Sequence, residues 1–271
     1  MEKKYRIAIV TAFIGNGGNS GELAITPEAQ VEFDDYGVDV YRFNNDNVDQ
    51  LRPFVEPTMG KDEVVSLSRW DRLVYWYYEH VKYRQDQRPK NVDDHTRLVA
   101  KIPKMMFYKV VPHCYDYYVW LDSKFTIHAH WLDYLLWLIE KYPSYDLITS
   151  KHSVRHSVEE ETLDMLKGLK AGYSSLWTKY YGADLAFQLN KYQHAVGFVD
   201  DRLNEMGMIV YSYRMLAKTQ FAEEWYAHNC YFTIQDQISF PFVSEKHRIK
   251  VASVGQSVYE VPFLTHEYSN S

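Results

Sequence analysis

The feature that most constrains the fold is a continuous apolar run near the N-terminus. Residues 7–14 read Ile-Ala-Ile-Val-Thr-Ala-Phe-Ile, without alternation between apolar and polar positions, and a glycine-rich segment follows at 15–21. A strand that is apolar on both faces is typical of a parallel sheet with helices on both sides. The run therefore predicts a central strand of an α/β protein that ends at a glycine-rich loop.

The segments that follow alternate between strand and helix patterns. Strand patterns occupy residues 38–43, 115–122, 145–149, 207–213 and 251–263, and helix patterns begin near 68 and 93 and cover 131–141, much of 157–194, and 216–240 with a break. This alternation is typical of an α/β fold with a largely parallel sheet. The length of 271 residues and the hydrophobic content of 46% indicate a globular chain with a large core. We therefore expect a single domain spanning residues 1–271.

Charge and cysteine content limit the classes of function. A net charge of −6 argues against nucleic acid as the main partner, because phosphate binding needs a dominant basic face. Cys114 and Cys230 make no disulfide framework, which favours a reducing compartment. The N-terminus has no signal-peptide pattern, and no apolar stretch is long enough to form a transmembrane segment. We therefore expect a cytoplasmic protein.

Aromatic residues make up 16% of the chain, and 24 of them are tyrosines. These rings either pack in the core or line a site for sugars or bases, since each combines an apolar face with a polar tip. The four glycines between residues 15 and 21 do not have the G-x-G-x-x-G spacing of a dinucleotide site. A flexible turn near a nucleotide is the better interpretation, and we expect Thr11, Ala12 and Phe13 to lie at that nucleotide.

The segment Trp120-Leu121-Asp122-Ser123-Lys124 places a carboxylate at the end of an apolar strand. Ligands of parallel sheets bind at this edge, so Asp122 either caps a turn or binds a metal ion or a sugar hydroxyl. Many nucleotide-sugar transferases have two carboxylates here, which hold a divalent ion on the diphosphate. The second position is Lys124, whose ammonium group is itself a cation suited to phosphate. We therefore expect weak or absent dependence on Mn²⁺ or Mg²⁺.

Basic residues follow two of the predicted elements. Arg97 and Lys101 are four residues apart, so they share one face of a helix. His152 and Arg155 follow the strand at 145–149, at the same edge of the sheet as Asp122. They either bind phosphate oxygens, which suit such donors, or Arg155 makes a surface pair with Glu159.

Four blocks of sequence, taken together, resemble a known family. They are the basic segment 97–104, the strand 115–124 that ends in Trp-Leu-Asp-Ser-Lys, the His-x-x-Arg block with acidic residues at 151–161, and the pair of segments 223–226 and 236–241. In this order and spacing they are similar to a family of GT-A-fold glycosyltransferase-like proteins, a former domain of unknown function that includes plant mucilage-related proteins. The resemblance covers roughly residues 95–245.

The resemblance implies a GT-A type fold, with a Rossmann-like, mainly parallel central sheet flanked by helices. Residues 1–125 would form a nucleotide-binding half and residues 126–271 an acceptor-facing half. The implied activity is that of a hexosyl- or pentosyltransferase in polysaccharide biosynthesis, which moves a sugar from a nucleotide-sugar donor to a saccharide or glycan hydroxyl. The alternatives are a nucleotide-dependent transferase of another group and a catalytically silent sugar-binding or scaffolding relative. The missing second carboxylate at Lys124 supports the silent relative.

The resemblance also implies roles for later residues. Asp236 would face the acceptor or the donor sugar and would take the proton of the acceptor hydroxyl, unless it is a helix cap or part of a buried network. His266 would join Asp122 at a metal ion, unless it lies on the surface. His128 and His130 share one face of an extended segment, and we favour a structural role for both. The full set of expected site residues is Asp122 and Asp236 for catalysis, Thr11, Ala12, Phe13, Arg97, Lys101, Asp122, Lys124, His152, Arg155 and Gln237 for donor binding, and Asp122 and His266 for a metal ion.

Overall fold

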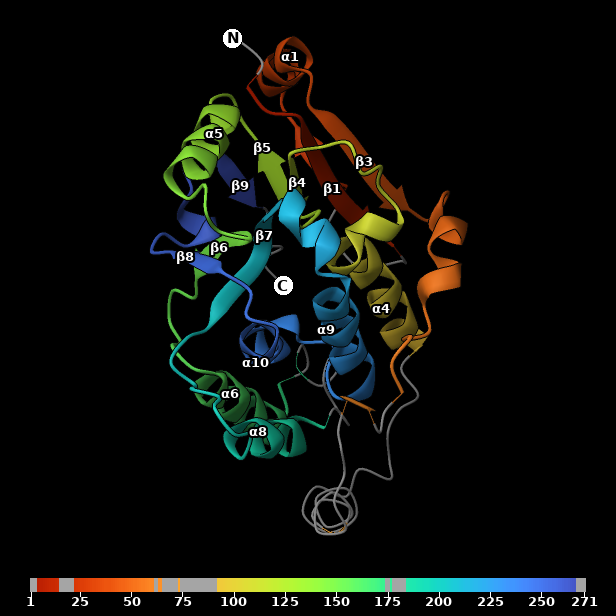
Figure 1. The fold of residues 1–271 in the computed structure, drawn as a ribbon, viewed down its shortest axis with the longest axis vertical. Helices are drawn as coiled ribbons and strands as arrows, with labels where there is room; N and C mark the ends of the chain where they lie inside the picture. The colour runs from red at the N-terminus through yellow and green to blue at the C-terminus, as the bar shows by residue number, and fades with distance from the viewer. Residues whose placement is uncertain are drawn as a thin grey trace.

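A computed structural model of the protein describes residues 4–14, 22–60, 63–64, 73, 92–173, 176 and 184–266. Its centre is a six-stranded sheet in the order β3-β1-β4-β7-β6-β8 (Figure 1). The strands are β1 (Ile7–Phe13), β3 (Asp39–Asn44), β4 (Tyr117–Leu121), β6 (Leu147–Lys151), β7 (Asn204–Ser212) and β8 (Val251–Val254). Five strands run parallel and β7 runs antiparallel to both of its neighbours. The predicted mainly parallel α/β sheet is confirmed, with one reversed strand.

Helices cover both faces of this sheet. One face packs on α1 (Pro27–Tyr36) and α5 (Trp131–Lys141), and the other on α4 (Val92–Met105), α9 (Thr219–Tyr231) and α10 (Asp236–Lys246). Strand β1 shows why its sequence does not alternate. Ile7 and Ile9 are buried against α1 and α5, whereas Ala8 and Val10 are buried on the side of α4 and α9. Both faces of the strand therefore need apolar side chains.

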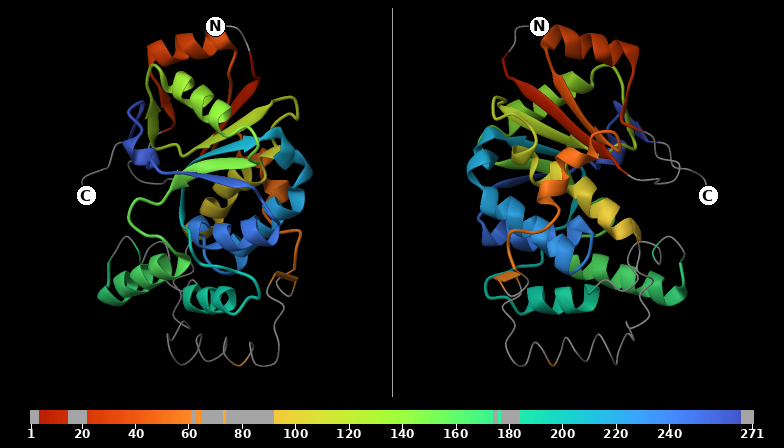
Figure 2. Two further views of the ribbon diagram at one scale, coloured as in Figure 1. Left: turned by 60° about the vertical axis from the view of Figure 1, so that its left-hand side comes forward. Right: turned by 90° about the vertical axis from the view of Figure 1, so that its right-hand side faces the viewer.

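A second, three-stranded sheet lies beside the first (Figures 1 and 2). It consists of β2 (Ala24–Ile25), β5 (Phe125–Ile127) and β9 (Leu264–His266). Strand β5 begins directly after Lys124, and the antiparallel pairing of Phe125 with His266 brings the last described strand beside it. The small sheet therefore joins the Asp122 turn to residues that come about 140 positions later in the chain.

Two more helices, α6 (Val158–Ala171) and α8 (Leu185–Gln193), pack together beside α10. Ser157 caps α6 by accepting a hydrogen bond from the Glu160 backbone N–H, and Gly172 ends it in the left-handed conformation with a φ of 78°. Short 3₁₀ turns complete the described elements: η1 (Val48–Gln50), η2 (Arg52–Phe54), η5 (Phe107–Lys109), η6 (Tyr213–Ala217) and η7 (Val258–Glu260). None of the helices in the described ranges is long and apolar enough to cross a bilayer.

Most predicted elements are confirmed, with shifted ends. The helix predicted over 131–141 is α5, and the helix predicted near 93 is α4. The strand predicted at 145–149 begins at Leu147 and continues to Lys151, and the last predicted strand region separates into β8 and β9. The glycine-rich segment at 15–21 and the expected helix start at Ser68 lie outside the described residues.

Gly207 in β7 is a test of how closely the two sheets pack. A Cβ atom at this position would lie 3.1 Å from Cε2 of Phe125 and 3.4 Å from Cγ1 of Val258. We predict that Gly207→Ala lowers the free energy of unfolding by about 1–3 kcal/mol, because the added methyl group overpacks the interface. Gly255→Ala is the control, since nothing lies within 4 Å of its added Cβ. Equal urea midpoints for the two variants would contradict this account of the packing.

Candidate functional site

The candidate site lies at the edge of the sheet where the parallel strands end. Strands β1 and β4 pair in register, with Val10 opposite Trp120, so Ala12 lies level with Asp122. Strand β6 runs in the same direction, and His152 follows its last residue. The structure therefore brings the ends of β1, β4 and β6 to one edge, as the sequence predicts.

Asp122 is held by neighbours from three parts of the chain. The Trp120 indole N–H donates to Oδ1 over 2.8 Å, and the Lys104 ammonium lies 3.7 Å from the same oxygen. The Lys124 ammonium lies 3.5 Å from Oδ2. The Asp122 backbone N–H donates to the carbonyl of Gly207, which ties the end of β4 to β7. The carboxylate is 29% exposed, so it is fixed in place and still accessible to a ligand.

Asp236 is the first residue of α10 and is buried. Its Oδ2 accepts from Lys101 over 2.6 Å and lies 2.5 Å from the Lys104 ammonium. Both lysines come from α4, so this cluster joins α4 to the start of α10. Lys104 also links Asp236 to Asp122, because its ammonium group approaches both carboxylates.

Burial and charge act in opposite directions on these groups. Burial alone would raise the pKa of Asp236, but attraction to Lys101 and Lys104 outweighs it and holds the pKa well below its usual value. Burial would lower the pKa of Lys104, but Asp236 and Asp122 raise it, whereas burial dominates for Lys101 and lowers its pKa. Asp236 is therefore an ionised carboxylate and a weak base in this arrangement. Its expected role as a proton acceptor stays a prediction, while the geometry shows a buried network.

Lys124 contacts residues from the C-terminal part of the chain. Its ammonium group donates to the Tyr259 hydroxyl over 2.6 Å and lies 4.8 Å from the centre of the same ring. The His266 ring lies at 5.0 Å from the Tyr259 ring. Burial, and then the positive charge of Lys124, lower the pKa of His266. The imidazole is therefore favoured in its neutral form beside the lysine.

The side chains around Asp122 do not fit a divalent metal ion. In the described ranges, no group of three or more His, Cys, Asp or Glu side chains is placed to hold one. Lys104 and Lys124 both lie within 4 Å of the Asp122 carboxylate, and their charges would repel a divalent cation there. His266, the second expected metal ligand, instead packs on Tyr259 next to Lys124. Three ammonium groups face the two carboxylates Asp122 and Asp236, which leaves a positive charge in excess.

Arg155 pairs with two acidic residues of α6. It contacts Glu161 and Asp164, the latter over 2.8 Å, and the pair with Glu159, the alternative to phosphate binding, is not formed. The reason is that α6 begins at Val158, so Arg155 precedes the helix and the i,i+4 rule does not apply. Glu161 in turn accepts from the side chain of Gln235, directly before Asp236. Arg155 and Lys101 therefore approach the start of α10 through different partners.

The other expected site residues lie at separate places around this edge of the sheet and on the small sheet. Burial lowers the pKa of His152, whose ring Nδ1 accepts from the Arg155 backbone N–H. Gln237 accepts from Gln235 over 2.7 Å, and Arg97 lies half-buried one turn before Lys101 on α4. The remaining placements are Thr11 and Ala12, buried near the end of β1, Phe13 as its last residue, His128 against Thr265, and His130 against Glu32 and Asp133.

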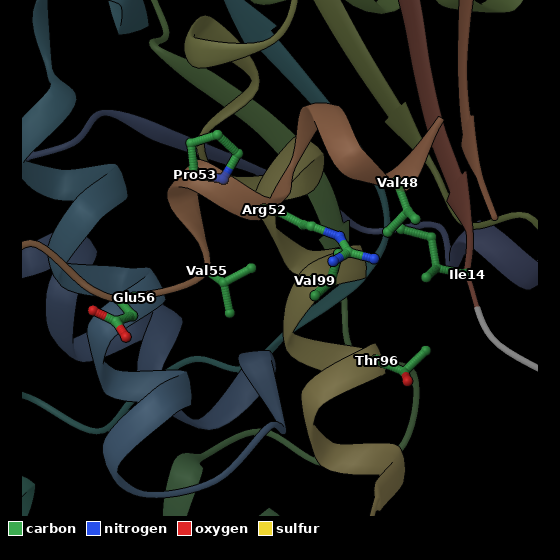
Figure 3. A pocket seen from close by; sticks show the side chains of 8 residues that line it. All are labelled: Ile14, Val48, Arg52, Pro53, Val55, Glu56, Thr96 and Val99. Atoms are coloured by element: carbon green, nitrogen blue, oxygen red, sulfur yellow. The ribbon is translucent and has the colours of Figure 1, made fainter. Parts of the chain in front are cut away.

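A pocket of about 620 Å³ opens beside the end of β1. Ile14, Val48 and Val99 are among its apolar lining residues, and Thr96 and Arg52 add polar groups. Figure 3 shows the Arg52 side chain extending from η2 across towards Ile14 and Val99. Helix α4 supplies Thr96 and Val99 to the pocket, and from other faces of the same helix it supplies Lys101 to Asp236 and Lys104 to both Asp236 and Asp122. The same helix therefore lines the pocket and supplies the lysines that pair with Asp122 and Asp236.

Three residues that contact this region were not predicted from the sequence: Lys104 at Asp122, Tyr259 at Lys124, and Glu205 at the Ser153 backbone N–H after His152. Lys104 follows Arg97 and Lys101 at helix spacing, which would have placed it on the same face, but Pro103 indicated that the helix was ending. Glu205 is buried within an otherwise mostly apolar strand, which is a recognisable signal of a functional or structural carboxylate. Tyr259 carries no signal in the sequence, since its role depends on the pairing of β5 with β9.

The chain belongs to a recognised family. A family model described as TOD1/MUCI70, glycosyltransferase-like domain, matches residues 89–261, which is more than half of the chain. The resemblance read from the four sequence blocks is confirmed. No curated protein sequence matches the chain closely enough to add a relative.

Several solved glycosyltransferases have a related architecture. Mouse xyloside xylosyltransferase 1, in its apo form, covers 98% of both chains with 9% identity and a TM-score of 0.46. For a glycosyltransferase involved in glycosylation of the major capsid of PBCV-1, the similarity covers 98% of this chain and 94% of the PBCV-1 enzyme chain, with 9% identity and a TM-score of 0.38. For glucosyl-3-phosphoglycerate synthase from Mycobacterium tuberculosis, solved with Mn²⁺, UDP and phosphoglyceric acid, the similarity covers 98% of this chain and 72% of the synthase chain, with 11% identity and a TM-score of 0.34.

Asp236 offers a test of the buried cluster. Asp236→Asn removes the charge that compensates Lys101 and Lys104, so we predict a loss of about 3–5 kcal/mol in the free energy of unfolding at neutral pH. Because the folded-state pKa of Asp236 is lowered, its contribution is present above the ordinary pKa of about 3.9 and is lost as the pH falls through the lower folded-state value. Urea unfolding between pH 7 and pH 2 measures both effects.

Asp49→Asn is the control, because this carboxylate is 80% exposed in its pair with Arg52. It should change the stability little, since exposed pairs contribute little. Equal losses in the two variants, or an Asp236→Asn variant with the same acid sensitivity as the wild type, would contradict the assigned network.

Proposed function

We propose that the protein is a glycosyltransferase that moves a hexosyl or pentosyl group from a nucleotide-sugar donor to a saccharide hydroxyl, in the synthesis of a polysaccharide or glycan. The observation that carries the proposal is the lysine cluster around Asp122, at the sheet edge of a chain that belongs to a glycosyltransferase-like family. Lys104 and Lys124 flank this carboxylate and supply excess positive charge where the strands end. A diphosphate leaving group is the substrate part that such a site suits.

We propose that the nucleoside of the donor binds in the pocket beside β1. Its apolar wall of Ile14, Val48 and Val99 suits the faces of a base, and Arg52 and Thr96 offer polar groups for its edge or for the ribose. A nucleoside there would direct its phosphates along α4 towards Lys101 and Lys104. We propose that residues 1–125 bind the donor in this way and that the later half faces the acceptor.

Each charged residue then has a proposed role. Asp122 accepts hydrogen bonds from the donor sugar or ribose, and Lys124 and Lys104 stabilise the charge that develops on the leaving phosphate. Asp236 holds Lys101 and Lys104 protonated and in place. Arg155 and His152, which follow β6 on the far side of β7 from β4, add donors for phosphate or sugar oxygens. Binding of the diphosphate is proposed to depend on these lysines and not on Mn²⁺ or Mg²⁺.

Release of nucleotide from a donor tests the activity. The wild type is incubated with UDP-glucose, UDP-xylose and GDP-mannose, and UDP or GDP release is measured with and without a mixture of oligosaccharides. We predict slow release from one donor by hydrolysis, and at least about a tenfold loss in Asp122→Asn, which corresponds to 1.4 kcal/mol of transition-state stabilisation. Asp116→Asn, a change just before the other end of β4, is the control. Binding without any release would instead indicate a silent sugar-binding relative.

The role of Lys124 is tested by nucleotide binding in the absence of metal. We predict that the wild type binds UDP or GDP in EDTA, and that Lys124→Met weakens the affinity at least about tenfold, because one charge-assisted hydrogen bond to phosphate contributes about 1.5–3 kcal/mol. Lys170→Met, an exposed lysine in the last turn of α6, is the matched control. Isothermal titration calorimetry gives both affinities. Binding by the wild type that disappears in EDTA and returns with Mn²⁺ would overturn the metal-independent site.

A further inference from the structure

We infer that Glu205 is a positioning residue of the donor site: it holds the turn at Ser257–Tyr259, and this turn places the Tyr259 hydroxyl on Lys124. The significance of Lys124 for phosphate rests on the proposed function, whereas the positioning itself rests on contacts between described residues. The hydrogen bonds of the Glu205 side chain go to Ser153, Ser257 and Val258, none of which is proposed to contact the substrate, so its effect on Lys124 passes through the turn.

Glu205 is 3% exposed and is surrounded by hydrogen-bond donors of η7 and its cap. The Ser257 hydroxyl lies 2.9 Å from Oε1 and 2.7 Å from Oε2, and the Val258 backbone N–H donates to Oε2 over 2.9 Å. The Ser153 backbone N–H approaches Oε1 at 3.3 Å. A buried carboxylate with several neutral donors acts as a rigid anchor, because each lost bond would leave a buried polar group without a partner.

The anchored turn carries Tyr259 to the lysine. Ser257 caps η7 by accepting from the Tyr259 backbone N–H over 3.2 Å, so the hydroxyl that binds Glu205 also fixes the backbone of Tyr259. The Tyr259 side chain then receives the hydrogen bond from Lys124 and places its ring under the same ammonium group. The contacts form one continuous path from Glu205 through Ser257 and Tyr259 to Lys124 and Asp122.

Glu205 also belongs to the same edge of the sheet as Asp122. The Asp122 backbone N–H bonds to the carbonyl of Gly207, two residues beyond Glu205 on the same face of β7. The anchor and the carboxylate are therefore fixed to one strand. A shift of η7 relative to β7 would move Tyr259 away from Lys124 while Asp122 stayed in place.

The reactivity of Lys124 tests this path without requiring any activity. In Glu205→Gln, one of the two carboxylate oxygens becomes an NH2 group, which cannot accept from the backbone N–H of Ser153 or of Val258 that it then faces, so the anchor loses an acceptor whichever way the amide turns. We expect the rate at which N-acetoxysuccinimide acetylates Lys124, followed by mass spectrometry, to rise about threefold or more as the turn opens locally. Tyr259→Phe should raise it similarly, because it removes the hydroxyl that receives the lysine hydrogen bond. Lys170 acetylation should be unchanged in every variant.

Glu260→Gln is the matched control, since this exposed carboxylate lies on the same turn. Ser257→Ala is the second variant, which interrupts the path at its middle and carries the test if Glu205→Gln does not fold. Raised Lys124 reactivity in folded Glu205→Gln, but not in Glu260→Gln, supports the proposal; if Glu205→Gln does not fold, Ser257→Ala decides in its place. An unchanged rate in the deciding variant, or an equal rise in Glu260→Gln, overturns the proposal, even if the melting temperature falls.

Calorimetric titration of UDP and GDP into the same variants separates this inference from the proposed function. Weaker binding in Glu205→Gln and Tyr259→Phe, with Glu260→Gln unchanged, supports both. If Lys124 reactivity rises but neither nucleotide binds the wild type, the positioning of Lys124 stands and its role in donor binding fails.

Discussion

The site depends on a single buried cation that two carboxylates share. The ammonium group of Lys104 lies 2.5 Å from Asp236 and 3.7 Å from Asp122, and its side chain is 5% exposed. A charge at this depth is stable only with compensating partners, because desolvation costs several kcal/mol for each ion. The pairing therefore fixes α4, the end of β4 and the start of α10 relative to one another. The rest of the site is arranged around this junction, with Lys101 on one side and Lys124 on the other.

This junction explains why the site suits an anion. The lysines outnumber the carboxylates they face, and the N-terminus of α10 adds the positive end of a helix dipole. Two carboxylates would attract a divalent ion, whereas one carboxylate between two lysines repels it. In the proposed site, these charges take the place of a metal ion on a diphosphate. The Tyr259 turn and its Glu205 anchor limit where one of these charges, Lys124, is placed.

Local pattern was enough to predict much of the fold and the place of Asp122. An apolar strand has few alternatives, and parallel strands bring their ends to one edge, so the position of Asp122 followed from its own segment. The contacts of Asp236 did not, because Lys101 is 135 residues away and only the packing of α10 on α4 joins them. The reversal of β7 and the partners of Arg155 likewise depend on where elements begin and pack, which one sequence does not show. Tyr259 reaches Lys124, 135 residues away, because β9 pairs with β5 and because Glu205 of β7 holds the η7 turn.

We propose that the lysine cluster binds the diphosphate of a nucleotide-sugar beside Asp122, and a crystal structure of the protein with UDP or GDP, grown in EDTA, would decide this. We expect phosphate oxygens within hydrogen-bond distance of Lys124 and Lys104, and the nucleoside in the pocket lined by Val99 and Arg52. A nucleotide bound elsewhere, or phosphates that contact Asp122 only through an added metal ion, would contradict it.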